Sequence, residues 1–164
     1  MLVSKGGLIV AETGRSARER AARIIIVEDH PIVRHGLRRL IETQPDLKVC
    51  GEAAGVLEAC ERVEALHPDV ILVDLALKDS DGMDLIRRIH TQWVGVKMIV
   101  VSTYEEATHG PKAITAGAMG FVSKHEAVDQ IIDAIRCVLG GKIFMKGAVT
   151  NSDGNGSADR HSGE

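Results

Sequence analysis

Acidic residues close two short apolar runs in this sequence. Residues 23–27 lead into Glu28 and Asp29, and the run 69–75 carries Asp74 near its far end. Both runs are rich in β-branched residues and too short for a typical helix, so they predict buried strands. A carboxylate at the end of a strand buried on both faces is costly unless a cation, a hydrogen bond or water meets it. These three acids are therefore the first candidates for chemistry.

A hydroxyl and an ammonium group end two further predicted strands. Ser102 closes the run 96–102, and Lys124 follows the run 119–123. The functional crevice of an open α/β sheet lies outside the carboxyl ends of its strands, where the strand order reverses. We therefore expect one crevice to gather five side chains: Glu28, Asp29, Asp74, Ser102 and Lys124.

Three carboxylates in one crevice repel one another and raise one another's pKa unless a cation sits among them. Mg²⁺ suits such a site because it takes one or two protein carboxylates and shares its other positions with water and phosphate oxygens. One acid is then free to capture a phosphoryl group covalently, with positive charge from the metal, Lys124 and backbone N–H groups around the equatorial oxygens. Ser102 can hydrogen-bond a phosphoryl oxygen.

The other apolar runs alternate between strand and helix patterns. Strands are expected at 23–28, 47–52, 69–75, 96–102 and 119–123, with 47–52 at a sheet edge because its alternation is partial. Helices are expected at 31–44, 56–66, 82–92 and 126–139, the last burying Val128, Ile131, Ile132, Ile135, Val138 and Leu139. Gly110 and Pro111 interrupt the stretch 104–117, which predicts a long loop and a shortened helix starting near Pro111.

Five strands alternating with five helices predict an α/β fold with a parallel sheet and helices on both faces. Residues 23–145 form one predicted domain. Residues 1–22 are expected to be an N-terminal extension that is partly disordered, and the polar residues 146–164 a disordered C-terminal tail.

Composition narrows the class of protein. Lys and Arg number 20 against 23 Asp and Glu, so no basic field favours nucleic acid. Cys50, Cys60 and Cys137 lie far apart inside apolar segments, which favours reduced, buried thiols and a cytoplasmic protein. No segment predicts secretion or a membrane span. The histidines share no ligand spacing, so surface or capping roles are expected for all of them, His30 included, and no zinc site.

Several motifs together resemble the receiver domain of two-component response regulators. They are 25–31 (Ile-Ile-Val-Glu-Asp-His-Pro), 73–75 (Val-Asp-Leu) with Asp81-Gly82, Val101-Ser102, and 120–124 (Gly-Phe-Val-Ser-Lys). The details at 29–31, 117–121 and 139–142 are similar to the NarL/FixJ-type subgroup.

The resemblance implies a flavodoxin-like doubly wound sheet with strand order 2-1-3-4-5. It implies phosphorylation of Asp74 by a sensor histidine kinase or a phosphotransfer protein. Mg²⁺ would be held by Asp29, Asp74 and the backbone carbonyl of Ala76, with Glu28 acting mainly through metal-bound water. The domain would assist its own phosphorylation and dephosphorylation without being an enzyme.

The resemblance also implies a switch. The phosphoryl group would draw in the Ser102 hydroxyl and let Phe121 turn inward. The surface of the fourth helix, fifth strand and fifth helix would then change its preference for a downstream protein partner, and a phosphorylation-dependent homodimer could form.

Some positions depart from the family pattern. Lys78 and His125 stand where many receivers have proline, so a trans bond is expected after Lys124. Ala76 has no side chain to orient a hydrolytic water, and Tyr104 could shield the phosphoryl group. Slow loss of phosphate is therefore expected.

Three alternatives stay open. The first is a haloacid-dehalogenase-like phosphotransferase, which also uses an Asp at the end of a strand. Such enzymes resemble one another in an Asp-x-Asp motif at that point, whereas this chain has Asp74-Leu75-Ala76. A receiver-shaped interaction module that never takes phosphate is the second. The third is a fragment of a DNA-binding transcriptional regulator, although the polar tail favours a stand-alone receiver that does not itself bind DNA.

Overall fold

The computed structural model describes residues 20–146, in which strands and helices alternate along the chain. The strands are β1 (Ala22–Val27), β2 (Leu47–Ala53), β3 (Val70–Val73), β4 (Lys97–Ser102) and β5 (Gly120–Ser123). The helices are α1 (Pro31–Ile41), α2 (Val56–Leu66), α3 (Gly82–Gln92), α4 (Glu106–Ala116) and α5 (Ala127–Leu139). The predicted extension at 1–22 and tail at 146–164 fall mostly outside the described residues, although β1 already begins at Ala22.

The five strands form one parallel sheet in the order β2-β1-β3-β4-β5, which confirms the predicted fold class and strand order. β2 lies at an edge, as its partial alternation predicts. The chain moves outward from β1 to β2 and then crosses to β3 on the other side of β1. The strand order therefore reverses between β1 and β3, whose last residues Val27 and Val73 are paired. A ligand crevice is expected at this point.

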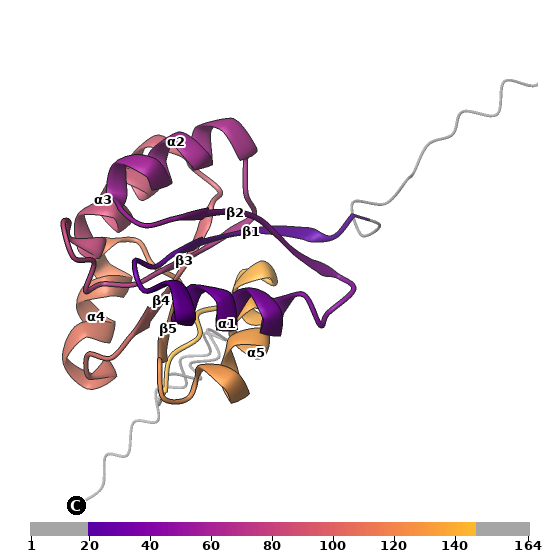
Figure 1. The fold of residues 1–164 in the computed structure, drawn as a ribbon. Coiled ribbons are helices and arrows are strands. Elements are labelled where there is room, and N and C mark those ends of the chain that lie inside the picture. The colour runs from indigo at the N-terminus through magenta and orange to yellow at the C-terminus, as the bar shows by residue number, and fades with distance from the viewer. Residues whose placement is uncertain (1–19, 147–164) are drawn as a thin grey trace, which may run out of the picture.

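Helices cover both faces of the sheet, and Figure 1 shows α2 and α3 on one side with α1 and α5 on the other. Strand β1 divides its side chains between the two faces, because successive residues point in opposite directions. Ile25 and Val27 join the core under α2, α3 and α4, whereas Ile24 and Ile26 join the core under α1 and α5. All four are 0–1% exposed, so the central strands cannot move without disturbing both layers.

Helix α4 corrects the prediction of a loop followed by a short helix near Pro111. It runs continuously over Glu106–Ala116 with Pro111 in its interior, so it is not shortened. A proline there removes one helical hydrogen bond and crowds the preceding residue. Gly110 is that preceding residue, and because it lacks a Cβ the crowding is relieved. Burial of Gly110 and Ala113 against neighbouring elements then outweighs the weak local preference.

Helix α5 corrects one predicted core position. Val128 is 74% exposed, although it is apolar and close to the predicted inner face. Ala127 takes the inward position instead, since it lies four residues before Ile131 on the same face of the helix.

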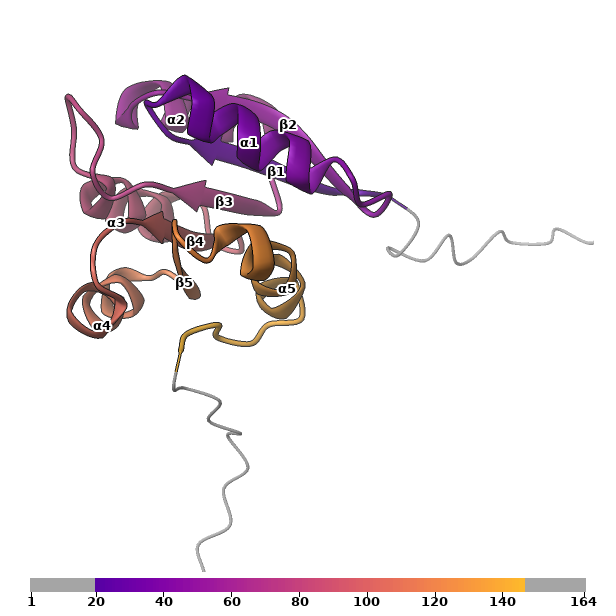
Figure 2. The same ribbon diagram turned by 60° about the horizontal axis from the view of Figure 1, so that its bottom comes forward.

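A segment at 142–146, called the C-terminal strap here, follows α5, and neither a helix nor a strand was predicted for it. Gly141 adopts a positive φ of 81°, and the chain then turns back toward α4 beside β5, as the yellow segment in Figure 2 shows. Phe144 pairs with Gly120: the Phe144 N–H donates to the Met119 carbonyl, and the Phe121 N–H donates to the Phe144 carbonyl, both at 2.9 Å. The strap thus extends the sheet beyond β5.

The side chains of the strap tie it to two helices. Met145 packs against the core beside Gly110 of α4. The Lys146 backbone N–H donates to the Glu106 carboxylate of α4, and its ammonium group contacts Glu126 just before α5.

Other predictions are settled within residues 20–146. No peptide bond there is cis, in agreement with the trans bond expected after Lys124. The three cysteines are free, as expected, but each is only partly buried, so the expectation of buried thiols is wrong. Burial still raises the pKa of the Cys50 and Cys60 thiols. None of the helices in this part of the chain has the length and apolarity needed to span a membrane.

Candidate functional site

Lys124 joins two buried acids at the carboxyl edge of the sheet. Its ammonium nitrogen lies 2.8 Å from Asp74 Oδ2 and 2.6 Å from Glu28 Oε2, and the two acids are only 2% and 1% exposed. Burial alone would lower the pKa of Lys124, but its hydrogen bonds to Asp74 and Glu28 raise the pKa above its ordinary value. The lysine therefore stays charged and compensates part of the acidic charge.

Backbone contacts fix the position of Asp74. Its N–H donates to the Val27 carbonyl at 2.9 Å, which extends the pairing of β3 with β1 by one residue. Its Oδ1 accepts a hydrogen bond from the Ala76 N–H at 3.0 Å. The first residue of α3, Gly82, packs against this turn so closely that a Cβ there would lie 2.2 Å from the Asp74 carbonyl oxygen. Glycine is thus required for α3 to begin beside the site.

Asp29 supplies the third carboxylate. Its Oδ2 accepts a hydrogen bond from the Lys78 N–H at 2.8 Å, whereas its buried Oδ1 has no hydrogen-bond partner within the described part of the chain. Burial acts to raise the pKa of Asp29, but the Lys78 N–H and the nearby His30 outweigh it and hold the pKa below its ordinary value. Oδ1 does lie 2.9 Å from His30 Nδ1, and a buried carboxylate oxygen that accepts no hydrogen bond fits a bound cation.

A ligand set for a metal ion follows from these contacts. Glu28, Asp29, His30 and Asp74 each offer one ligand atom, and the four atoms lie within 4.8 Å of one another. The carboxylates among them fit Mg²⁺, which takes oxygen ligands and retains several waters.

His30 is the fourth residue of this group. Its Nδ1 lies 2.9 Å from both Glu28 Oε1 and Asp29 Oδ1. The side chain is 64% exposed, which agrees with the expected surface role, and it does not cap α1.

Ser102, at the end of β4, is fully buried at the same edge. Its Oγ accepts a hydrogen bond from the Tyr104 N–H at 3.1 Å, and its carbonyl accepts one from the Lys124 N–H at 2.9 Å. The second bond ties the ends of β4 and β5 together and positions Lys124. Tyr104 is 43% exposed, and its ring stacks on His109 of α4, with ring centroids 4.7 Å apart.

Phe121, the proposed switch aromatic, lies in β5 and is fully buried in the core under α2, α3 and α4. The inward position that the resemblance assigns to the switched state is thus already occupied in this structure.

The fold and site define a doubly wound α/β protein with a lysine-compensated acidic site at its topological switch point. Comparison of the sequence with known families identifies it further. Residues 24–136 match the response regulator receiver domain, and the chain belongs to this family of two-component signalling proteins. The family is a signal-receiving one rather than a family of classical enzymes.

Individual relatives agree with this assignment. The chain is 35% identical over 127 residues to the uncharacterized transcriptional regulatory protein YhcZ of Bacillus subtilis, covering 77% of this chain and 59% of that protein. It is 34% identical to the transcriptional regulatory protein LiaR of the same organism, covering 87% of this chain and 66% of that protein. The chain therefore spans about three fifths of the length of such curated relatives.

Solved structures share the flavodoxin-like receiver fold. A two-component response regulator of the LuxR family from Aurantimonas sp. SI85-9A1 superimposes with a TM-score of 0.73 at 35% identity, covering 76% of this chain and 89% of that one. The response regulator domain of Thermotoga maritima CheB gives a TM-score of 0.68 at 30% identity, covering 74% of this chain and 98% of that one.

Proposed function

We propose that this domain accepts a phosphoryl group on Asp74 from a sensor histidine kinase or a phosphotransfer protein, in a Mg²⁺-dependent reaction. The observation that carries the proposal is the contact of Lys124 with Asp74 and Glu28, at 2.8 Å and 2.6 Å, beside a third carboxylate, Asp29, whose buried Oδ1 accepts no hydrogen bond within the described residues.

The reaction forms one bond and breaks another. A carboxylate oxygen of Asp74 attacks the phosphorus of the donor phosphohistidine, and the phosphorus–nitrogen bond breaks with its electron pair going to the imidazole, which takes a proton from solvent. Lys124 neutralises negative charge on the phosphoryl oxygens, and the Ala76 N–H holds the acceptor carboxylate in place. Mg²⁺, when bound, supplies further positive charge at the transferring oxygens.

Asp29, Asp74 and the backbone carbonyl of Ala76 would hold the Mg²⁺, and Glu28 would act mainly through metal-bound water. The pKa of Asp29, held below its ordinary value, keeps this ligand ionised at neutral pH. Metal binding needs deprotonated carboxylates, so the site is ready for the ion without an acid–base step.

The phosphorylated state would change the surface of α4, β5 and α5 through Ser102. The hydroxyl of Ser102 would leave the Tyr104 N–H to bond a phosphoryl oxygen, which moves the start of the loop into α4. Phe121, already buried, would keep its inward position in that state. The C-terminal strap lies on the same surface, so a downstream protein partner or a second copy of the chain would meet Phe144 and Met145 as well.

The phosphoryl group would be lost slowly. Ala76 has no side chain that could orient a hydrolytic water, and Tyr104 lies next to the site loop. Direct DNA binding is not proposed for this chain, and a cytoplasmic location fits its free cysteines, because thiols persist in reducing compartments.

Intact-mass spectrometry after incubation with acetyl phosphate and Mg²⁺ tests the proposal. The expected result is a mass increase of one phosphoryl group that is lost in Asp74→Asn and with EDTA, but kept in Asp79→Asn, which changes an exposed acid in the same loop. An unlabelled wild-type protein, also with phosphorylated histidine donors, would favour the phosphorylation-independent interaction module instead.

A further inference from the structure

We infer that the groove between α3 and α4 binds the outer face of α2 from a second copy of this chain, in a two-fold symmetric dimer. The contact goes beyond the proposed function and needs no phosphoryl group. The groove and α2 lie on the same side of the sheet, because α3 packs between α2 and α4 there, as Figure 1 shows.

The groove carries positive charge that nothing in the described part of the chain compensates. Arg87 of α3 and Lys112 of α4 line it and are exposed, and neither forms an ion pair within residues 20–146. The ion pair of α3 uses the neighbouring Arg88 and Asp84 instead. None of the described residues that line the groove is acidic. The groove therefore favours a partner surface with acidic side chains.

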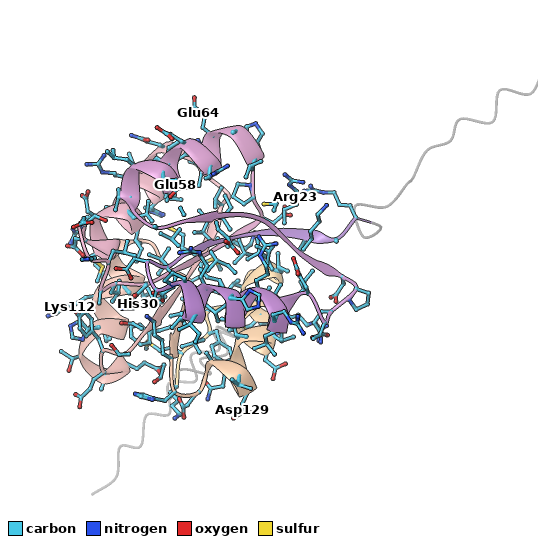
Figure 3. All side chains as sticks on the ribbon, viewed as in Figure 1. Arg23, His30, Glu58, Glu64, Lys112 and Asp129 are labelled. Carbon is cyan, nitrogen blue, oxygen red and sulfur yellow. The ribbon has the colours of Figure 1, made fainter. Side chains whose placement is uncertain are left out.

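Helix α2 presents such a surface. Leu57, Glu61 and Glu64 follow one another at helical spacing and are all exposed, Leu57 to 74%. Neither Glu61 nor Glu64 forms an ion pair within the described residues. Figure 3 shows Glu64 on the outer side of α2 and Lys112 on the outer side of α4. The stripe thus begins with an apolar side chain and continues with two free carboxylates.

The order of side chains along α2 matches the order along α3. The two helices begin at the same level, because the first N–H of α2 donates to Ser80 Oγ, just before α3, at 3.4 Å. Leu57 and Met83 are the second residues of their helices, and Glu61 and Arg87 are the sixth. Apolar therefore stands level with apolar, and acid with base.

The other wall of the groove has its base at the same level. A Cβ on Gly117, which follows α4, would lie 2.4 Å from the His90 ring, so the end of α4 is level with His90 of α3. Arg87 and Lys112 each precede this contact by about one helical turn. They therefore face each other across the groove.

A two-fold axis parallel to the helices uses both surfaces twice. Rotation about such an axis keeps every residue at its level and turns the same side of the two copies toward each other. Each α2 then lies in the groove of the other copy, with Leu57 on Met83 and Glu61 between Arg87 and Lys112. Such an interface closes on itself and leaves neither surface open for a third copy.

Sedimentation velocity of the tag-free full chain, without phosphoryl donor or divalent ion, tests the dimer. The protein should change from monomer to dimer as its concentration rises from about 10 µM to about 500 µM at low salt. Raising the ionic strength to about 0.5 M should weaken association by about tenfold or more, because the ion pairs are screened.

Reversed charges locate the interface. Glu61→Lys alone, and Arg87→Glu combined with Lys112→Glu, should each be monomeric, since like charges would meet in both halves of the dimer. The two variants mixed in equal amounts should form a heterodimer, because opposite charges then meet in both halves. Asp129→Lys, which reverses an exposed charge on α5, should dimerise like the wild type. Circular dichroism establishes that each variant is folded.

The outcomes separate this interface from the proposed function. A wild-type chain that stays monomeric throughout overturns the inference and leaves phosphorylation of Asp74 untouched. Variants that dimerise alone, or that stay monomeric when mixed, show that α2 does not bind the groove and also overturn it.

Discussion

Lys124 is the residue on which the electrostatics of the site depend, because it lies between two acids that are almost fully buried. Replacing it by Met leaves Glu28 and Asp74 without a counter-charge. We expect the free energy of unfolding at pH 7 to fall by about 3–5 kcal/mol in metal-free buffer, as for other broken buried ion pairs. Urea denaturation measures the free energy of unfolding, and Lys112→Met, which removes an exposed lysine, is the control for the loss of charge alone. If Lys124→Met lost no more stability than this control, Lys124 would not be the counter-charge of the buried acids.

The same contact makes a prediction about pH. The folded-state pKa of Lys124 is raised, so the stabilisation is complete below the unfolded pKa of about 10.4 and is lost as pH rises through the folded value. The difference in stability between wild type and Lys124→Met should therefore be constant from pH 7 to about pH 10 and shrink above it. A difference that grows with alkaline pH would contradict the assignment.

At the residue scale, strand ends were enough to predict which acids and which lysine meet. Glu28, Asp74 and Lys124 follow apolar runs, and the common edge of a parallel sheet brings them together. The contact of His30 with Glu28 and Asp29 could not be predicted in this way, because it depends on where those two side chains turn, which periodicity does not encode.

Two prolines at different helix positions allow a matched comparison at the scale of elements. Pro111 lies inside α4, and Pro31 is the first residue of α1. Pro111→Ala restores a helical hydrogen bond and should stabilise the protein by about 1–3 kcal/mol. Pro31→Ala should change stability by less than about 0.5 kcal/mol, since an N–H at a helix start has no helical partner. Thermal and urea unfolding measure both. Equal effects would show that α4 is not a regular helix at Pro111.

The C-terminal strap can be tested through one backbone donor. Phe144→Pro removes the N–H that bonds the Met119 carbonyl, whereas Phe144→Leu keeps that donor and an apolar side chain. The proline variant should be less stable than the leucine variant by about 1 kcal/mol or more. Its Phe121 amide should also exchange faster with deuterium, because that N–H bonds the Phe144 carbonyl. Unchanged exchange in both variants would show that the strap does not pair with β5.

At the element scale, helix and strand periods predicted all five strands and four of the helices within a few residues. Helix α4 and the strap were mispredicted for related reasons. Pro111 is locally unfavourable for helix, and residues after Gly141 show no period. Helix α4 and the strap are both stabilised by the contact between Gly110 and Met145. These residues are far apart in the sequence, so no local pattern predicts their contact.

The whole molecule should respond to a metal ion through its stability. Glu28, Asp29 and Asp74 outnumber Lys124, so ion binding relieves repulsion only in the folded state. Mg²⁺ at a hundred times its Kd should raise the free energy of unfolding by about 2.7 kcal/mol, reversed by EDTA. Asp29→Asn should lose most of this effect and still fold. An equal increase in the free energy of unfolding for the wild type and Asp29→Asn would show that Mg²⁺ binds at another site.

At the scale of the whole molecule, alternation of strands and helices predicts a parallel α/β sheet, but several strand orders satisfy it. The order 2-1-3-4-5 came from resemblance in the motifs around Asp29, Asp74 and Lys124. The pattern of strands and helices thus predicted the type of sheet, and the family resemblance predicted the strand order.

Reductive trapping of the acyl phosphate tests the central claim most directly. The full chain is incubated with acetyl phosphate and Mg²⁺, treated with borohydride, digested, and analysed by tandem mass spectrometry. The acidic site predicts homoserine at position 74 and at no other acid, with no product when Lys124 is replaced by Met or Mg²⁺ is removed. Homoserine at Asp29 or another acid, or none in a folded protein that binds Mg²⁺, would contradict Asp74 as the phosphoacceptor.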